Sequence, residues 1–259
     1  MVSFSDAQLQ AWMATFLWPL ARVLGLLMTA PFLSDNTIPQ TVKILLGCLI
    51  TLAIAPTLGP MPAVAVGSWE GLAILAREVA IGAALGMVLQ LLFGAVALAG
   101  ELVATQMGLG FSTLYDPASE SSTTSLTAVL TTMAALTFFA IDGHLALFGA
   151  LAQTFQTLPV AGRGLHTAGL HELAAYGGVL CLHGVTMALP LTMTMIIVNV
   201  ALGMLSRAAP QLNIFSIGFP ITLGAGVMML SLGLPEWLRA FDQLWEVAFD
   251  GVARCAAAL

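Results

Sequence analysis

The chain has 259 residues, of which 59% are hydrophobic and only 8% are charged. Soluble domains carry about 25% charged residues, so this composition excludes an ordinary water-soluble domain and indicates an all-helical, polytopic membrane protein. The net charge of -6 leaves no basic patch that could neutralise a run of phosphates, which argues against nucleic acid as a partner.

Six apolar runs are long enough to be predicted as membrane helices, because about 20 residues span the hydrocarbon layer. In chain order they cover residues 9–33, 44–66, 72–100, 126–155, 173–205 and 212–234. As unbroken helices, the third, fourth and fifth runs would exceed a hydrocarbon core of ~30 Å. We therefore expect them to be broken, folded back or extended past the membrane. The candidate breaks are Asp142-Gly143, Pro190, and Pro220 with Gly224 and Gly226.

Three charged residues fall inside these runs. Arg22 lies near the middle of the first run and has no acid three or four residues away on either side. Since a charge at mid-membrane is costly, another element must supply its partner, or this helix is not surrounded by lipid. Arg77 and Glu78 are adjacent and point about 100° apart on a helix, so we expect that they do not simply neutralise each other. Interhelical salt bridges and a proton or ion pathway both remain open.

Small residues in the third run predict close helix packing. Gly82 and Gly86 form a GxxxG pattern, and Gln90 and Gly94 continue it at the same spacing. Small residues on one stripe let helix backbones approach each other. The contact can lie within the chain or against a partner subunit.

A polar connection over residues 106–125 interrupts the apolar chain between the third and fourth runs. It is rich in Gly, Ser and Thr, and it contains no Lys or Arg. A connection this long inside a compact fold usually has a function, although an ordinary solvated loop has the same composition. Its candidate functional residues are Gln106, Met107, Gly108, Gly110, Phe111, Leu114, Tyr115, Asp116 and Pro117.

The last part of the chain contains a short polar turn, residues 207–213, and an amphipathic tail. The tail is predicted as a helix over residues 236–255 with tryptophans typical of a membrane interface. Its apolar stripe consists of Trp237, Phe241, Leu244, Trp245, Ala248 and Val252. Its polar stripe consists of Arg239, Asp242, Glu246 and Asp250.

No pattern in the sequence points to catalysis. His166, His171, Cys181 and His183 are grouped, but their spacing matches none of the usual zinc patterns. Neither Gly-x-Gly pair continues into a phosphate-binding motif or a nucleophile elbow. We therefore expect no enzymatic activity, no metal and no cofactor.

Four blocks of sequence resemble the FliR family of type III secretion export-gate subunits, in particular its flagellar members. The first block, residues 22–56, contains the Arg, Ala-Pro, Ile-Pro and Lys of that family in order. The others cover residues 100–117, 142–160 and 207–221. The last block includes a turn with the family-type residues Arg207, Pro210, Gln211, Asn213, Phe215 and Pro220.

This resemblance implies a single FliR-type domain over residues 1–259, with bent helical hairpins, in the inner membrane at the flagellar basal body. It implies a helical hetero-oligomeric gate with FliP and FliQ, with FlhB around its entrance, surrounded by membrane lipid. Unfolded flagellar substrates would pass through this gate. Residues 106–125 would correspond to a plug-like segment that helps to close the pore at rest, and the turn that begins at Arg207 would be structural.

A secondary membrane transporter is the alternative interpretation, because transporters also use broken helices. It predicts similarity between the two halves of the chain, and no convincing repeat is found. A membrane-embedded enzyme comes third, since it requires a reactive constellation. A transporter should purify as a monomer or homo-oligomer, whereas a gate subunit should purify with other polypeptides.

Overall fold

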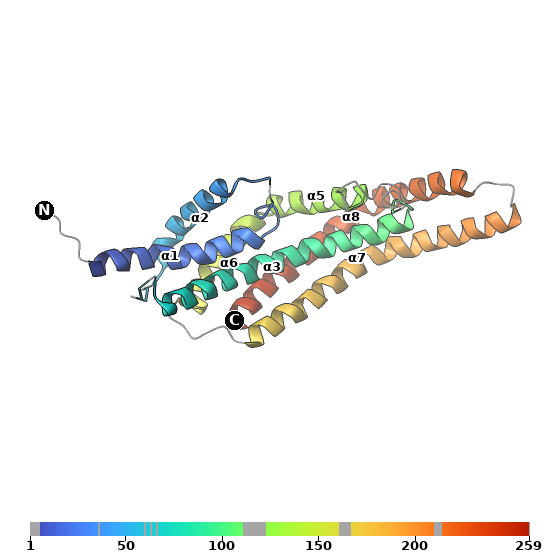
Figure 1. The fold of residues 1–259 in the computed structure, drawn as a ribbon. Helices are drawn as coiled ribbons and strands as arrows, with labels where there is room; N and C mark the ends of the chain where they lie inside the picture. Colours follow the sequence, from blue (N-terminus) through green and yellow to red (C-terminus); the bar gives the residue numbers. More distant parts are fainter. Residues whose placement is uncertain are drawn as a thin grey trace. The chain divides into compact units, whose positions relative to one another are not determined.

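A computed structural model describes residues 6–35, 37–59, 61–62, 64–65, 67–110, 123–160, 167–209 and 214–258. Within these ranges the protein consists of helices without strands (Figure 1), which confirms the predicted all-helical class. The helices are α1 (Asp6–Thr29), α2 (Gln40–Ile54), the short 3-10 helix η1 (Ala55–Thr57), α3 (Trp69–Gln106), α5 (Ser125–Ala140), α6 (Gly143–Thr157), α7 (Thr167–Ala208) and α8 (Ile214–Ala258).

Three helices are long and apolar enough to cross a membrane by length and composition. They are α3 and the segments His171–Ala208 of α7 and Ile217–Arg254 of α8, each of 38 residues. The bent pair α5 and α6 becomes a fourth candidate if it is one span. The third and fifth apolar runs are therefore extended beyond the membrane thickness, one of the outcomes expected from their length.

The predicted helix breaks are right in one place and wrong in two. The break at Asp142-Gly143 is confirmed, since Asp142 adopts a left-handed conformation with φ 56° between α5 and α6. By contrast, α7 continues through Pro190, and α8 continues through Pro220. A proline removes one backbone hydrogen bond, and a long apolar helix tolerates this loss when neighbouring groups satisfy the freed carbonyl.

The amphipathic tail forms the C-terminal half of α8, because this helix also continues through Pro235. All six residues of the predicted apolar stripe are buried, whereas the four charged residues of the opposite stripe are exposed. The assignment of the tryptophans to a membrane interface is wrong for this chain. Trp237 is 6% exposed and Trp245 is 2% exposed, since both pack against other parts of the protein.

The chain forms two compact units, each described separately below. Unit 1 comprises Met1–Leu91, Asp142–Gly177 and Ala248–Leu259. Unit 2 comprises Leu92–Ile141 and Gly178–Val247.

In unit 1, α1 packs closely on the first half of α3 and also contacts α2. The core includes Trp18, Leu26, Leu27, Ile81 and Leu85, which are fully or almost fully buried. These residues come from α1 and α3, so the two helices share one apolar interior.

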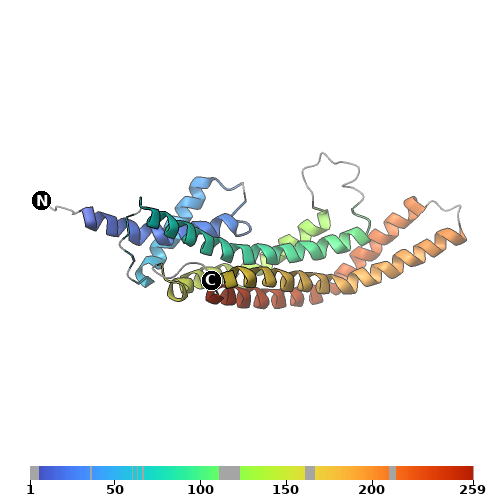
Figure 2. The ribbon, with the colours of Figure 1, turned by 60° about the horizontal axis from the view of Figure 1, so that its bottom comes forward.

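In unit 2, the second half of α3 packs with α5, α7 and α8. Three aromatic rings join α3, α5 and α8. The ring centroid of Phe93 lies 6.3 Å from that of Phe138 and 5.4 Å from that of Trp245, and the centroids of Phe138 and Trp245 lie 4.9 Å apart. Such pairs add about 0.5–1.5 kcal/mol beyond the burial of their area. Figure 2 shows α7 and α8 side by side along much of their length.

Candidate functional site

The first candidate site surrounds Arg22 in unit 1, where the side chain is completely buried. Its Nε donates to Glu78 Oε2 of α3 at 2.7 Å. Its Nη1 donates to Thr154 Oγ1 at 3.0 Å, and its Nη2 donates to the carbonyl of Leu158 at 2.8 Å. The ring of Phe155 lies 4.0 Å from the guanidinium carbon. The partner that the sequence required for Arg22 therefore comes from another helix.

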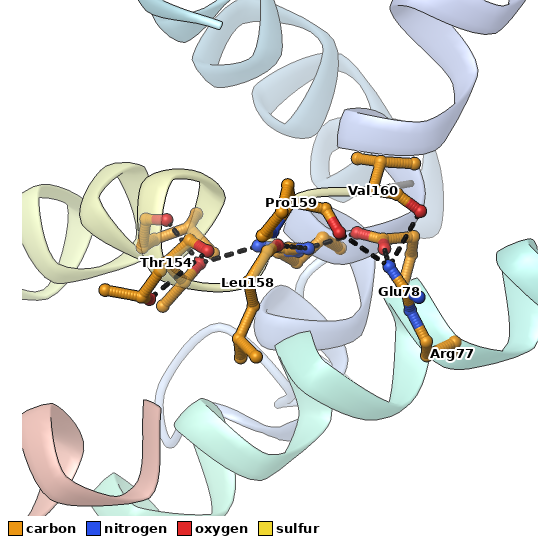
Figure 3. A network of polar contacts seen from close by, with 9 residues as sticks. Arg77, Glu78, Thr154, Leu158, Pro159 and Val160 are labelled. Atoms are coloured by element: carbon orange, nitrogen blue, oxygen red, sulfur yellow. Dashed lines mark hydrogen bonds and ion pairs between the residues drawn. The ribbon is translucent and has the colours of Figure 1, made fainter. Parts of the chain in front are cut away.

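Arg77 belongs to the same network (Figure 3). Its Nη2 donates to Glu78 Oε1 at 3.2 Å and to the carbonyls of Pro159 and Val160 at 2.9 and 2.7 Å. Arg77 and Glu78 do form an ion pair, but they do not simply neutralise each other, because Glu78 also pairs with Arg22. The long arginine side chain folds back towards its neighbour, so Glu78 is shared by two arginines.

The network also holds the segment that follows α6. This helix ends at Thr157, and the carbonyls of Leu158, Pro159 and Val160 accept from the two arginines. Backbone carbonyls are strong hydrogen-bond acceptors. They therefore accept from the arginine N–H groups that Glu78 does not bind, and the network joins α1, α3 and the segment that follows α6.

The geometry favours an interhelical salt bridge over a proton pathway. A guanidinium group does not release its proton at physiological pH, and both carboxylate oxygens of Glu78 accept from arginines. The hydroxyl of Thr154 accepts from Arg22 and donates to the carbonyl of Leu151 at 2.6 Å. These hydrogen bonds fix the orientation of the side chains, so the network is suited to a rigid structural role.

Two of the three predicted packing glycines lie against α1. A Cβ on Gly82 would overlap the carbonyl oxygen of Arg22, and a Cβ on Gly86 would overlap the hydroxyl of Thr29. Gly94 differs, because no atom of the described residues lies within 4 Å of the position of its Cβ. The close contact of the first two glycines is thus made within the chain, and Gly94 does not contribute to it.

The second candidate site is the polar connection in unit 2, of which the structure describes residues 106–110 and 123–125. Gln106 accepts from Asn199 Nδ2 of α7 through its backbone carbonyl at 3.1 Å and its side-chain oxygen at 3.3 Å. Met107 is buried, and Gly108 has φ 83°, a conformation that favours glycine. The space around a Cβ on Gly110 is open as far as the described residues extend. Outside the described residues lie the candidates Phe111, Leu114, Tyr115, Asp116 and Pro117.

The far end of this connection is held by Glu101, which sequence reasoning missed. Glu101 Oε2 accepts from the hydroxyl of Thr124 at 3.2 Å and from that of Thr127 at 3.1 Å. Thr124 is the N-cap of α5. The available signal was that Glu101 is the only charged residue between positions 79 and 115. The two ends of the connection are therefore both fixed to neighbouring helices.

The predicted family turn is described only in part. Arg207 is exposed in the last turn of α7, where its charge complements the helix dipole. Phe215 lies in the first turn of α8, and Pro220 lies inside that helix. Pro210, Gln211 and Asn213 lie outside the described residues.

Comparison with known proteins gives one consistent result. Residues 13–248 match the family model described as bacterial export proteins, family 1. The flagellar biosynthetic protein FliR of Escherichia coli K12 is 41% identical over 253 residues, which cover 98% of this chain and 97% of the relative. The protein of that name from Pectobacterium carotovorum is 40% identical with the same coverage. The one from Bacillus subtilis is 24% identical over 83% of this chain and 84% of its own length.

Proposed function

We propose that this chain, which belongs to family 1 of the bacterial export proteins and to its FliR members, is a structural subunit of a flagellar protein-export gate. It is a flagellar biosynthetic protein with helices of membrane-spanning length. The observation that carries the proposal is the 41% identity to a FliR protein over 98% of the chain. The gate would stand in the inner membrane and pass unfolded flagellar proteins.

The exposed apolar faces of α7 and α8 support an assembled state. Leu182, Ile197 and Met204 of α7 are 62–69% exposed, and Val227 and Leu232 of α8 are 56% and 69% exposed. Large contiguous apolar surface marks contact with a membrane or with other proteins. We propose that FliP and FliQ subunits and lipid cover these faces, and that FlhB joins the assembly.

The fixed ends of the segment 106–125 support a role in closing the pore. A pore wide enough for an unfolded chain must retain ions at rest, since one elementary charge crossing 100 mV is worth about 2.3 kcal/mol. Its apolar residues Phe111, Leu114 and Tyr115 are suited to fill such a pore. Asn199 at one end and Glu101 at the other would hold the two ends of this plug in place.

Complementation combined with purification tests the proposed function. The chain, carrying an affinity tag, is expressed in a flagellated bacterium that lacks its own FliR protein. We expect motility and export to return, and FliP and FliQ to co-purify in mild detergent. A tagged chain that reaches the membrane, purifies as a monomer or homo-oligomer and restores no export would overturn the proposal and favour the transporter alternative.

A further inference from the structure

The helices α7 and α8 in unit 2 each have an uncharged part and a part that contains charged or titratable residues. Residues 184–206 of α7 and 214–235 of α8 contain no Asp, Glu, Lys, Arg or His. Each stretch is about 33 Å long as a helix at 1.5 Å per residue, close to a hydrocarbon core of ~30 Å. His183 precedes the first stretch and Glu236 follows the second. Both stretches therefore end in a polar residue on the side away from the connection between the helices, as expected at a membrane surface.

The exposure of side chains changes at the same level. On the uncharged side, large apolar side chains of both helices face outward, and Ile197 and Leu232 are each 69% exposed. On the charged side, α8 exposes Glu236, Arg239, Asp242, Gln243 and Glu246 and buries Trp237, Phe241, Leu244 and Trp245. The first pattern is suited to lipid and the second to water.

A groove lined by both helices crosses this level. α7 and α8 run antiparallel here (Figure 2), and the groove has a volume of ≈ 790 Å³, within the range of about 300–1,000 Å³ of small-molecule sites. Its uncharged end is lined by Met187, Leu191, Met229 and Leu232, and its charged end by His183, Glu236, Arg239 and Gln243. The hydroxyls of Thr186 and Thr194, which also line it, donate to carbonyls of their own helix. The groove therefore requires an occupant that is apolar at one end and polar at the other.

The charged end presents a cation and an anion side by side. Arg239 Nη1 donates to Glu236 Oε1 at 3.0 Å, and both side chains are 73% exposed. Such a pair keeps further N–H groups and carboxylate lone pairs for another partner. His183 Nδ1 donates to the carbonyl of Val179 at 2.8 Å, so in the neutral ring Nε2 is an acceptor. This end of the groove thus offers donors for an anion and acceptors for an ammonium group.

We infer that the groove binds one phospholipid of the surrounding membrane whose headgroup contains both a phosphate and a primary ammonium group, as in phosphatidylethanolamine. One acyl chain lies along the uncharged end, the phosphate accepts from Arg239, and the ammonium group donates to Glu236 and His183. A headgroup with a phosphate alone would leave Glu236 beside an anion. An apolar partner helix would bury both charges at a desolvation cost. The inference goes beyond the proposed export function, because it requires only that α7 and α8 lie in a membrane.

Lipid retention by the purified complex is the first test. The complex is placed in nanodiscs with equal amounts of phosphatidylethanolamine and phosphatidylglycerol, returned to mild detergent, and its retained lipids are counted by mass spectrometry. We expect phosphatidylethanolamine to be enriched roughly fivefold, the size of one exposed charge contact. Retention of the two lipids in the proportion supplied would overturn the inference.

A leucine in the groove tests where this lipid lies. Gly233 lines the groove, and only Trp237 Cδ1, at 3.8 Å, lies near the position of its Cβ among the described residues. Gly233→Leu should therefore fill the groove and lose one phosphatidylethanolamine per copy of the chain. Gly224→Leu is the matched control, because Gly224 lies in the same helix outside the groove and has open space among the described residues. Equal lipid retention by the two variants would contradict the assignment to this groove.

Exchanging the charges tests the headgroup without changing the fold, because both side chains are exposed. Arg239→Gln and Glu236→Gln should each reduce the enrichment of phosphatidylethanolamine. Glu236→Lys places two cations at the groove and should shift the preference to phosphatidylglycerol. A preference that stays the same in all three variants rules out the proposed headgroup contacts. These variants also decide the matter if Gly233→Leu does not assemble.

A photoactivatable phosphatidylethanolamine with its reactive group on the acyl chain locates the bound lipid directly. We expect labelling to concentrate on residues 187–194 and 229–237 of the assembled complex. Labelling spread evenly over the exposed apolar faces, or a groove occupied by a partner polypeptide, would overturn the inference. A chain that retains the lipid in the groove but restores no export removes the proposed function and leaves the lipid site standing.

Discussion

At the scale of single residues, the cost of a buried charge explains the geometry around Arg22. Removing one partner of a buried ion pair leaves an uncompensated charge, which costs about 3–5 kcal/mol. Glu78 is the acid in question, since it accepts from both Arg22 and Arg77 and its side chain is completely buried. Exposed pairs contribute far less, typically about 0–1 kcal/mol.

Glu78→Gln is therefore expected to lower the free energy of unfolding by about 3–5 kcal/mol. The measurement is thermal or denaturant unfolding of the purified complex in detergent. Glu236→Gln is the matched control, because Glu236 forms an ion pair with Arg239 in which both side chains are 73% exposed. Equal effects of the two substitutions would show that the buried network does not stabilise the fold.

At the scale of helices, α3 presents two kinds of glycine on one predicted stripe. Gly82 lies against the backbone of α1, whereas the space around Gly94 is open among the described residues. Added side-chain atoms in a close helix contact typically cost about 1–3 kcal/mol through displaced backbones. An open helical glycine has the opposite tendency, since alanine is a better helix former by about 1 kcal/mol.

We predict that Gly82→Ala destabilises the chain by about 1–3 kcal/mol, while Gly94→Ala leaves its stability unchanged or slightly raised. Unfolding of the two variants side by side measures this difference. If Gly94 faces a partner subunit, Gly94→Leu should reduce co-purification of FliP and FliQ without loss of the chain itself. Retained co-purification would assign that part of α3 to lipid.

Deletion of residues 110–120 is the corresponding prediction for the polar connection. Both ends of the connection are fixed by hydrogen bonds at Gln106 and Thr124, so the shortened chain should still fold and assemble. We expect raised ion leak and greater sensitivity to small molecules, with some export retained. Unchanged membrane conductance in cells that contain the assembled variant would make the connection an ordinary loop.

At the scale of the whole molecule, the chain satisfies its buried charges and close glycines internally and leaves apolar helix faces uncovered. From the sequence, the contacts of Arg22 and of the glycine stripe can lie within the chain or in a partner subunit. In the structure, Arg22, Gly82 and Gly86 all find their neighbours within unit 1. Dependence on partners is then expected from the exposed faces of α7 and α8.

We accordingly predict that the chain expressed alone aggregates or is degraded, and that co-expression with FliP and FliQ stabilises it by mass action. Size-exclusion profiles and half-lives in mild detergent measure this effect. A monodisperse and long-lived isolated chain would contradict the need for an assembly. As a control, the Glu78→Gln variant should stay less stable than the parent even with partners, because its defect lies inside the chain.

Sequence alone determined the features that depend on local composition and periodicity. These are the all-helical membrane class, the break at Asp142, and the buried and exposed stripes of the C-terminal half of α8. The family blocks likewise lie in the linear order of residues. The insertion cost of a charge was also enough to require a partner for Arg22.

Only the tertiary structure decided which residues meet across helices. Arg22 is 56 residues from Glu78 and 132 residues from Thr154, and Thr222 is 115 residues from Met107. Such contacts depend on the rotation and register of helices that pack together, and helical periodicity defines neighbours only three or four residues apart. The same limit hid the contacts of Glu101 with Thr124 and of Gly226 with Met107, because neither residue type indicates what lies opposite it in space.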